Sequence, residues 1–538
     1  MITTINLILS NQSKNLELKV FDKKIVTSLA KYHSINNNSF DIEITFIDDI
    51  EFFRTHDYQW AKSDKELVAS EYTPKIVKLK NGFYIQPTIQ VGIWEFNPKY
   101  KNKILWRINP EFSATITKYS GPKNEKKVES VFYPFDFNNE IALVFSNKNA
   151  IEFSRSPIPF SAIACFTDHC DFDTLDNLKS QRAFFKENEI KITKGFFLNH
   201  YSKREDNASF ENNFDELLKW KNDGHELCYH SLSQSLKNDK ESFEDFVSFE
   251  NPINSIPTWI DHGYQPYNFS LYENLGFEES EFVKVLNKNK IEILWNYIDS
   301  GTSTLGVLNQ LNSNDFTLKS YFKGIKNLSF KDKFALKIKI ILFHYYADQE
   351  TITKYKNVSS SFKKCVEQKK IRQLFHFVQT LISISIPIVK VFFYWNSIKN
   401  KPFKFAKYAP VVFKHKIQNF KFTIFQTIEI VDFKKSLSFK NIDKLAEEKG
   451  LFIAHTYFSV PMKYHFGKLF KSENIVDQEV ADNFSYLSSK IKSNQIWNPT
   501  ISELVQFLSK FEDIKLDVNE SGNIICSTNF DLPYRDIN

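Results

Sequence analysis

Two short stretches carry acidic and histidine side chains directly after apolar runs. The first, residues 165–173, reads CFTDHCDFD, and the second, residues 224–231, reads GHELCYHS. If the apolar runs are strands of an α/β fold, the polar residues after them converge at the carboxyl ends of those strands. Carboxylate and imidazole groups gathered there can hold a divalent metal ion that activates water. The two stretches therefore predict a hydrolase.

The chemistry of such a site needs three protein ligands, an open metal position and a nearby base. His169 and His230 are candidate ligands, and Asp168, Asp171 or Asp173 are candidates for the base or the third ligand. His225 precedes His230 by an odd number of residues, which places the two on opposite faces of a strand. We therefore expect His230 to face the site, with His225 packed elsewhere or behind the ligands.

The elements that must position these residues follow an α/β rhythm. The pattern predicts strands at residues 161–167, 192–198, 225–229, 256–260 and 291–299, with helices at 174–188 and 213–222. The rhythm returns after about residue 425, with a helix at 441–449 and a strand at 450–457 that ends near His455. A helix near 496–508 follows, capped by Thr500 or Ser502. Strands alternating with helices predict a mainly parallel sheet or barrel.

Four regions differ in pattern. Residues 1–155 alternate short aromatic and β-branched runs with turn residues, which predicts a β-rich N-terminal domain. Residues 156–304 form the first part of the α/β unit, and residues 441–538 complete it and add a β tail. Residues 305–440 interrupt the unit as a basic, aromatic and mostly helical insertion.

This order of segments resembles the polysaccharide deacetylase family over about 160–300 and 440–510. The resemblance implies a distorted (β/α) barrel and metal-dependent removal of acetyl groups from carbohydrate. Asp168 falls on the family's catalytic base, His169 on a metal-binding acid and His230 on the first metal histidine. Gln234 stands where the second metal histidine is expected, and the family's Arg-x-Pro-Tyr segment lacks its arginine at residues 259–267.

The resemblance also implies roles for residues further along the chain. His455 falls on the histidine that assists as general acid, and His262 could complete the altered ligand set around a divalent metal, with zinc as the expected ion. The substrate-binding candidates are Asp171, Asp173, Asp261, Tyr267 and Trp295.

The function expected from the resemblance is hydrolysis of an N-acetylated or O-acetylated sugar or glycan precursor. The alternative is a catalytically inactive barrel that binds glycan or a partner protein, which the altered ligand set favours.

Charge is distributed unevenly along the chain. The net charge is +6, but residues 321–420 hold 20 Lys and Arg against 4 acidic residues, which leaves 50 basic and 60 acidic residues elsewhere. The apolar run at 374–395 is about long enough to span a bilayer, whereas Gln379, Pro387 and Lys390 disfavour a span. Three alternatives stay open: helices packed on each other, peripheral contact with an anionic membrane, or a span. No recognised motif accompanies the basic segment, so we expect no nucleic-acid partner.

The five cysteines show no C-x-x-C spacing, and a disulfide framework is not expected at this size. The first ten residues lack the basic start and long apolar core of a signal peptide. The expected location is the cytoplasm, at the periphery of the inner membrane if the basic segment binds it.

Overall fold

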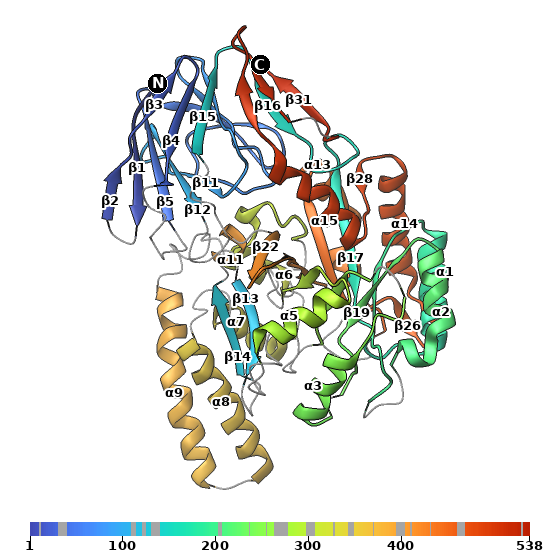
Figure 1. The fold of residues 1–538 in the computed structure, drawn as a ribbon. Helices are drawn as coiled ribbons and strands as arrows, with labels where there is room; N and C mark the ends of the chain where they lie inside the picture. Colours follow the sequence, from blue (N-terminus) through green and yellow to red (C-terminus); the bar gives the residue numbers. More distant parts are fainter. Residues whose placement is uncertain are drawn as a thin grey trace.

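The fold is described from a computed structural model of the chain. The structure describes residues 1–538 with the exception of residues 10–11, 31–39, 109–114, 121–124, 131–139, 203–206, 236, 254–255, 263–277, 297–306, 327–328, 343–348, 369–370, 394–403, 409–410, 431, 460–467 and 529–530. Figure 1 shows a β part that contains the N-terminus, a mixed α/β part, and a pair of long helices that project away from both.

The N-terminal part consists of two antiparallel sheets that share one core. Their strand orders are β2-β1-β5-β12-β11-β8 and β3-β4-β15-β10-β9-β6-β7. Alternating burial along β5 (Phe40–Phe46) is typical of a strand with one face in a core. The rings of Trp94 and Trp106 meet edge to face in this core, with 6.1 Å between centroids. The other strands are β1 (Ile2–Leu9), β2 (Gln12–Asn15), β3 (Lys19–Phe21), β4 (Lys24–Ser28), β6 (Ile50–Arg54), β7 (Trp60–Lys62), β8 (Leu67–Ala69), β9 (Val77–Leu79), β10 (Tyr84–Pro87), β11 (Ile93–Phe96), β12 (Lys103–Ile108) and β15 (Glu140–Ser146), with a separate hairpin of β13 (Thr115–Ser120) and β14 (Glu125–Ser130).

The α/β part is built on one large sheet in the order β22-β23-β21-β20-β19-β18-β17-β25-β24, with β28 beside β17. All its strand pairs are parallel except β22 with β23. The strands are β17 (Ala162–Asp168), β18 (Thr193–Phe196), β19 (Glu226–His230), β20 (Thr258–Ile260), β21 (Ile293–Trp295), β22 (Val412–Ile417), β23 (Phe420–Phe425), β24 (Ile428–Glu429), β25 (Leu451–Thr456) and β28 (Ile496–Trp497). Every residue of β17 is buried, as expected for a parallel strand covered on both faces.

Helices connect these strands and cover the sheet. They are α1 (Leu175–Glu187), α2 (Phe210–Asn222), α3 (Asp239–Ser248), α5 (Glu279–Lys288), α12 (Phe433–Ser436), α13 (Phe439–Glu447), α14 (Gln478–Lys492) and α15 (Ile501–Ser509). Thr174 begins α1 with a reciprocal capping box to Asn177, and Thr500 begins α15 in the same way with Glu503. Of the two caps expected for α15, Thr500 is therefore the one used.

The predicted distorted (β/α) barrel of the deacetylase type is wrong, because the described strands form an open half-barrel sheet. β23 pairs with β21, and β24 pairs with β25, so the segment 420–429 reaches from one side of the sheet to the other. The ladder is interrupted between these strands at Gln426 and Thr427. Gln426 instead uses its backbone N–H and C=O to bond Val411 and Gln310, so no continuous ring of paired strands forms.

The two parts are joined by buried contacts. Arg155, 1% exposed, donates hydrogen bonds to the backbone oxygens of Tyr72 (3.1 Å), His56 (2.7 Å) and Lys449 (2.7 Å). β16 (Ala150–Phe153) pairs with β31 (Tyr534–Ile537). The remaining short pairs are β26 (Phe470–Ser472) with β27 (Ile475–Val476) and β29 (Leu516–Val518) with β30 (Ile524–Cys526). The segment after β16 and the end of the chain therefore hold the junction together.

The region predicted as an insertion contains α6 (Leu318–Gly324), α7 (Phe330–Ile340), α8 (Gln349–Gln368), α9 (Ile371–Phe393) and α11 (Lys404–Tyr408). Strands β22, β23 and β24 also fall within residues 305–440, yet they belong to the large sheet. Burial does not alternate along these strands: β22 (VFKHKI) is buried at its first two residues and its last, and β23 (FKFTIF) is buried over its last four residues. None of the helices in the described part of the chain is long and apolar enough to cross a membrane.

Candidate metal centre

The carboxyl ends of the parallel strands gather the residues singled out in the sequence. β17 ends at Asp168 and leads to His169 and Asp171, β19 ends at His230, and β25 carries His455 near its end. The buried runs fix the direction of each strand, so the polar residues after them meet at one edge. Ser231, directly after β19, has a φ of 63°, and this left-handed residue turns the chain out of the strand.

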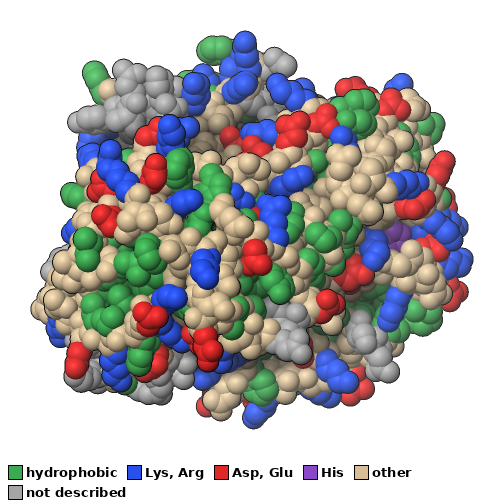
Figure 2. All heavy atoms as spheres, turned by 90° about the horizontal axis from the view of Figure 1, so that it is seen from above, with side chains coloured by type: hydrophobic (Ala, Val, Ile, Leu, Met, Phe, Trp, Pro, Cys, Tyr) green, Lys and Arg blue, Asp and Glu red, His purple; other side chains and the backbone are tan. Residues whose placement is uncertain are grey.

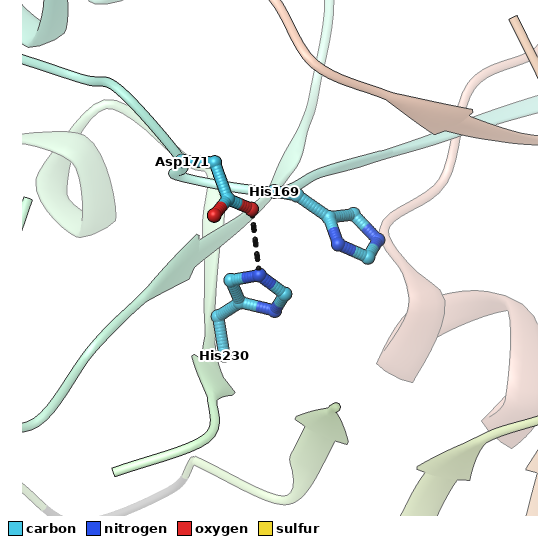
Figure 3. A group of neighbouring side chains, drawn as sticks. All are labelled: His169, Asp171 and His230. Atoms are coloured by element: carbon cyan, nitrogen blue, oxygen red, sulfur yellow. Dashed lines mark hydrogen bonds and ion pairs between the residues drawn. The ribbon is translucent and has the colours of Figure 1, made fainter. Parts of the chain in front are cut away.

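His169, Asp171 and His230 form a compact group of three possible metal ligands. One ligand atom from each lies within 4.8 Å of the others, and Figure 3 shows the Asp171 carboxylate pointing toward the His230 ring, with the His169 ring to one side of both. The His230 Nε2 lies 3.0 Å from the Asp171 Oδ2. The His230 Nδ1 lies 3.3 Å from the backbone oxygen of Ile260, to which it can donate its proton. Such a bond leaves Nε2 with a free lone pair, the form in which histidine binds metals.

His169 has the most unusual surroundings of the three. It is 1% exposed, and neither ring nitrogen has a hydrogen-bond partner among the residues that the structure describes. A buried polar group without a partner is costly, and such groups are rare in folded proteins. Burial, together with the imidazoles of His455 and His230, lowers the pKa of His169 well below its usual value. The ring is therefore neutral and able to act as a ligand, so it fits a divalent ion at this place.

Asp171 supplies the negative charge of the group. Burial alone would raise its pKa, but His262 and His230 outweigh burial and hold the pKa well below its ordinary value. Two imidazoles and one carboxylate form a donor set that suits zinc and related divalent transition metals. The identity of the ion stays a prediction.

His262, also predicted as a ligand, lies beside the group at its outer side. Its Nδ1 is 3.2 Å from the His230 Nε2 and 3.4 Å from the Asp171 Oδ1. Its side chain is 18% exposed, whereas that of His230 is fully buried. The backbone N–H of His262 donates to the Ser231 Oγ, which in turn donates to Asp261. Asp261, predicted to bind substrate, thus helps to hold the strand end that bears His262.

Aromatic rings enclose the group on the opposite side. His455, predicted as the general acid, stacks on His169 with 4.1 Å between centroids. Trp295, predicted to bind substrate, meets both rings edge to face at 5.1 and 5.0 Å, and its Nε1 donates to Thr427. Tyr457 lies 4.8 Å from His169 and is half-buried. Unlike His169 and Trp295, the side chains of Tyr457 and His262 are partly exposed.

Asp168 and Asp173 lie in a separate buried ion-pair cluster around Lys194. The Lys194 Nζ donates to both carboxylates and to the Gln181 Oε1. The other oxygen of Asp168 accepts the backbone N–H of Phe458 at 3.1 Å. Burial raises the pKa of Asp168 to about 7, while the carboxylates of Asp168 and Asp173 raise the pKa of Lys194 above its ordinary value and keep it charged. The base role of Asp168 and the substrate role of Asp173 stay predictions.

Sequence reasoning missed Lys194 and Tyr457. Lys194 lies in the apolar run 192–198, and a lysine inside a buried strand was the available signal, because it needs a carboxylate partner. Tyr457 gave no signal beyond its nearness to His455. His225 packs on Trp220 and accepts the backbone N–H of Ile192, so it is a packed residue. Gln234 is buried beside Ser202, and Tyr267 lies outside the described residues.

Comparisons with known proteins give little similarity. No protein-family model matches the chain, and no curated protein does. Among solved structures, a glycoside hydrolase family 31 dextranase of Flavobacterium johnsoniae, complexed with isomaltotriose, shares 9% identity, with a TM-score of 0.29 over 94% of this chain and 63% of that chain. A glycoside hydrolase family 97 enzyme of a Pseudoalteromonas species shares 11% identity, with a TM-score of 0.24 over 55% of this chain and 58% of that chain. The chain thus spans less than two thirds of either protein, and TM-scores this low establish no common fold.

These findings correct the family and the activity inferred from the sequence. The assignment to the polysaccharide deacetylases is wrong: no model of that family matches, and the solved structures found are glycoside hydrolases. The expected removal of acetyl groups, and the retired deacetylase barrel offered as its alternative, both rested on that assignment and are withdrawn with it. The local match at residues 224–231 reproduced a short motif, and a short motif alone does not define a family.

Proposed function

We propose that the chain is a metal-dependent hydrolase whose divalent transition-metal ion is held by His169, Asp171 and His230. The observation that supports this most is His169, a buried imidazole whose ring nitrogens have no hydrogen-bond partner among the described residues. A ligand atom of a carboxylate and one of a second imidazole lie within 4.8 Å of one of its own. A bound ion would use the lone pair that burial otherwise leaves unsatisfied. It would also balance the charge of Asp171.

The surrounding residues support a hydrolytic role. When bound, an ion of this kind polarises a substrate oxygen and strengthens water as a nucleophile at neutral pH. His262 lies at the solvent side of the group, where its ring can bind substrate or move a proton. His455 and Trp295 pack against His169 and hold its ring in place. Three protein ligands leave room for substrate, as in catalytic rather than structural sites.

We propose a carbohydrate as the substrate. The half-buried ring of Tyr457 lies beside His169, and the partly exposed ring of His262 lies beside His230. Aromatic side chains beside a few placed polar groups are typical of small-molecule sites. A sugar ring offers an apolar face to the aromatic side chain and hydroxyl groups to the polar one. The bond that is cleaved is left to experiment.

Metal dependence separates this proposal from hydrolysis by two carboxyl groups. That mechanism needs two carboxyl groups on either side of the scissile bond. Here the buried carboxylates of Asp168 and Asp173 are both bonded to Lys194, and Asp261 accepts from Ser231. Only a metal-dependent enzyme would lose activity reversibly on treatment with a chelator.

The test begins with the metal content of the purified protein, measured by elemental mass spectrometry. Wild type is compared with His169→Ala, His230→Ala and the control His376→Ala, an exposed histidine of α9. We expect about one equivalent of a divalent metal in wild type and control, and a loss in both site variants. Absence of metal in wild type after reconstitution with zinc, cobalt, nickel and manganese would overturn the proposal.

Hydrolysis is then assayed with chromogenic glycosides, phosphate esters and butyrate esters, followed by oligosaccharides. The expected result is activity that a chelator removes and the metal restores. Metal-loaded protein that hydrolyses none of these substrates, or activity that survives complete metal removal, would contradict the hydrolase proposal.

A further inference from the structure

The outer face of α9 is apolar and exposed. Phe375 and Phe393 are 76% and 83% exposed, and Ile382 is 61% exposed. Further exposed apolar side chains lie on the same helix: Leu374, Val378, Leu381, Ile386 and Val389. Scattered apolar residues are normal on protein surfaces, but a continuous group of this size marks an interaction site.

The spacing of these residues places them along one side of the helix. At 100° per residue, the eight fall within one arc of less than half a turn. A second side packs on α8, where Ile384 is buried and the rings of Phe377 and Phe362 lie 5.4 Å apart. A third side carries the polar residues His376, Gln379, Ser383 and Lys390. The apolar side therefore remains uncovered after α8 and α9 have packed on each other.

Figure 1 shows that the helical hairpin of α8 and α9 points away from the two sheet-containing parts. In this view α8 and α9 stand clear of the large sheets along most of their length. The face in Figure 2, seen from the side opposite the free end of the hairpin, carries basic, acidic and hydrophobic side chains interspersed.

The sequence that contains the hairpin has a strong excess of positive charge. Residues 368–428 contain no Asp or Glu, and residues 321–420 hold 20 Lys and Arg against 4 acidic residues. On α8, Lys356 and Lys364 are exposed, while Glu350 is paired with Lys354. An apolar helix face next to lysines is the pattern of helices that lie in the interface of an anionic bilayer.

We propose that the apolar side of α9 binds in the plane of an anionic lipid surface, with the neighbouring lysines against the headgroups. The charge decides between this occupant and a second copy of the chain. A second copy would bring the same excess of positive charge and repel the first, whereas anionic headgroups neutralise it. The bound state is interfacial, with α9 lying along the surface.

The test is co-sedimentation of the full chain with vesicles of phosphatidylcholine alone or with about 30% phosphatidylglycerol, an anionic lipid that gives the surface a negative potential. We expect binding to the anionic vesicles that weakens with added salt, and little binding to the neutral ones. The variant Phe375→Ser/Ile382→Ser should bind anionic vesicles at least about tenfold more weakly than wild type, because two large side chains no longer enter the lipid. A matched control, Val20→Ser/Ile47→Ser, removes two equally exposed apolar side chains of the N-terminal part and should bind as wild type does.

Three results would overturn the proposal. The first is that the chain does not bind anionic vesicles, and the second is that it binds neutral vesicles as tightly as anionic ones. The third is that the control variant loses as much vesicle affinity as Phe375→Ser/Ile382→Ser does. Light scattering of the free protein tests whether this face instead binds a second copy of the chain. If wild type is a dimer, Phe375→Ser/Ile382→Ser is a monomer and neither binds vesicles, the apolar side of α9 serves self-association. Because all four substituted residues are exposed, circular dichroism should show unchanged folding.

Discussion

The ring of His455 stacks on the ring of His169, with 4.1 Å between centroids and 21° between planes. The two residues come from neighbouring parallel strands at distant points in the sequence, because β25 pairs with β17. The stack holds one face of the His169 ring. A ligand that is held by packing rather than by a hydrogen bond keeps both of its nitrogens available.

Asp171→Asn is expected to weaken metal binding by about tenfold or more, because the site loses its only charged ligand. The measurement is competition with a chromophoric chelator. Asp173→Asn is the matched control, since Asp173 lies next to Lys194 instead. It should lower stability and leave metal affinity nearly unchanged. Equal losses of affinity in the two variants would show that the group of three ligands has been chosen wrongly.

Lys194→Met is expected to destabilise the protein by about 3–5 kcal/mol, since it leaves two buried carboxylates without their cation. The free energy of unfolding is measured by urea titration. Lys191→Met, three residues earlier, removes a partly exposed ion pair with Glu503 and should cost about 1 kcal/mol or less. If Lys194→Met lowers the free energy of unfolding no more than Lys191→Met does, the cluster around Lys194 is not buried as described.

The stability of the α/β part should fall in mild acid because of His225. Burial lowers the pKa of His225 from 6.5 to about 4, so the folded state favours the neutral ring. This contribution, at most about 3 kcal/mol, is fully present above pH 6.5 and is lost as the pH falls from 6.5 to about 4. His225→Asn keeps an acceptor for Ile192 without a titrating ring, and should lose less stability between pH 7 and 4.5. If the variant loses as much stability as wild type between pH 7 and 4.5, His225 is not the source of the acid sensitivity.

Gly195→Ala should weaken metal binding together with stability. A Cβ there would lie 2.6 Å from the backbone oxygen of Asp168 and 3.3 Å from the Cβ of His230. The strands on both sides must therefore shift, and His230 shifts with them. Gly82→Ala provides a control with backbone strain alone, since Gly82 has a φ of 88° and open space around it. Normal metal affinity in Gly195→Ala would contradict the close approach.

Part of the site followed from local pattern. Acids and histidines after apolar runs predicted the meeting of His169, Asp171 and His230, because a buried strand fixes where its end lies. The partner of Asp168 did not follow, since Lys194 reaches it only after β17 and β18 pair in register. The interruption of the sheet at Gln426 was equally hidden, because it depends on backbone bonds to Val411 and Gln310 that no periodicity encodes. The family assignment went wrong because it rested on short motifs, which say little about how distant segments of the chain come together.

The pairing of β16 with β31 bears on the order in which the molecule is completed during synthesis. Strands β1 to β15 are made first and share their own core, so they can fold early. β16, which follows them directly, stays without its partner until the ribosome has added residues up to Ile537. The edge of β16 that pairs with β31 thus stays unpaired while residues 154–533 are made, and the pair forms only after them.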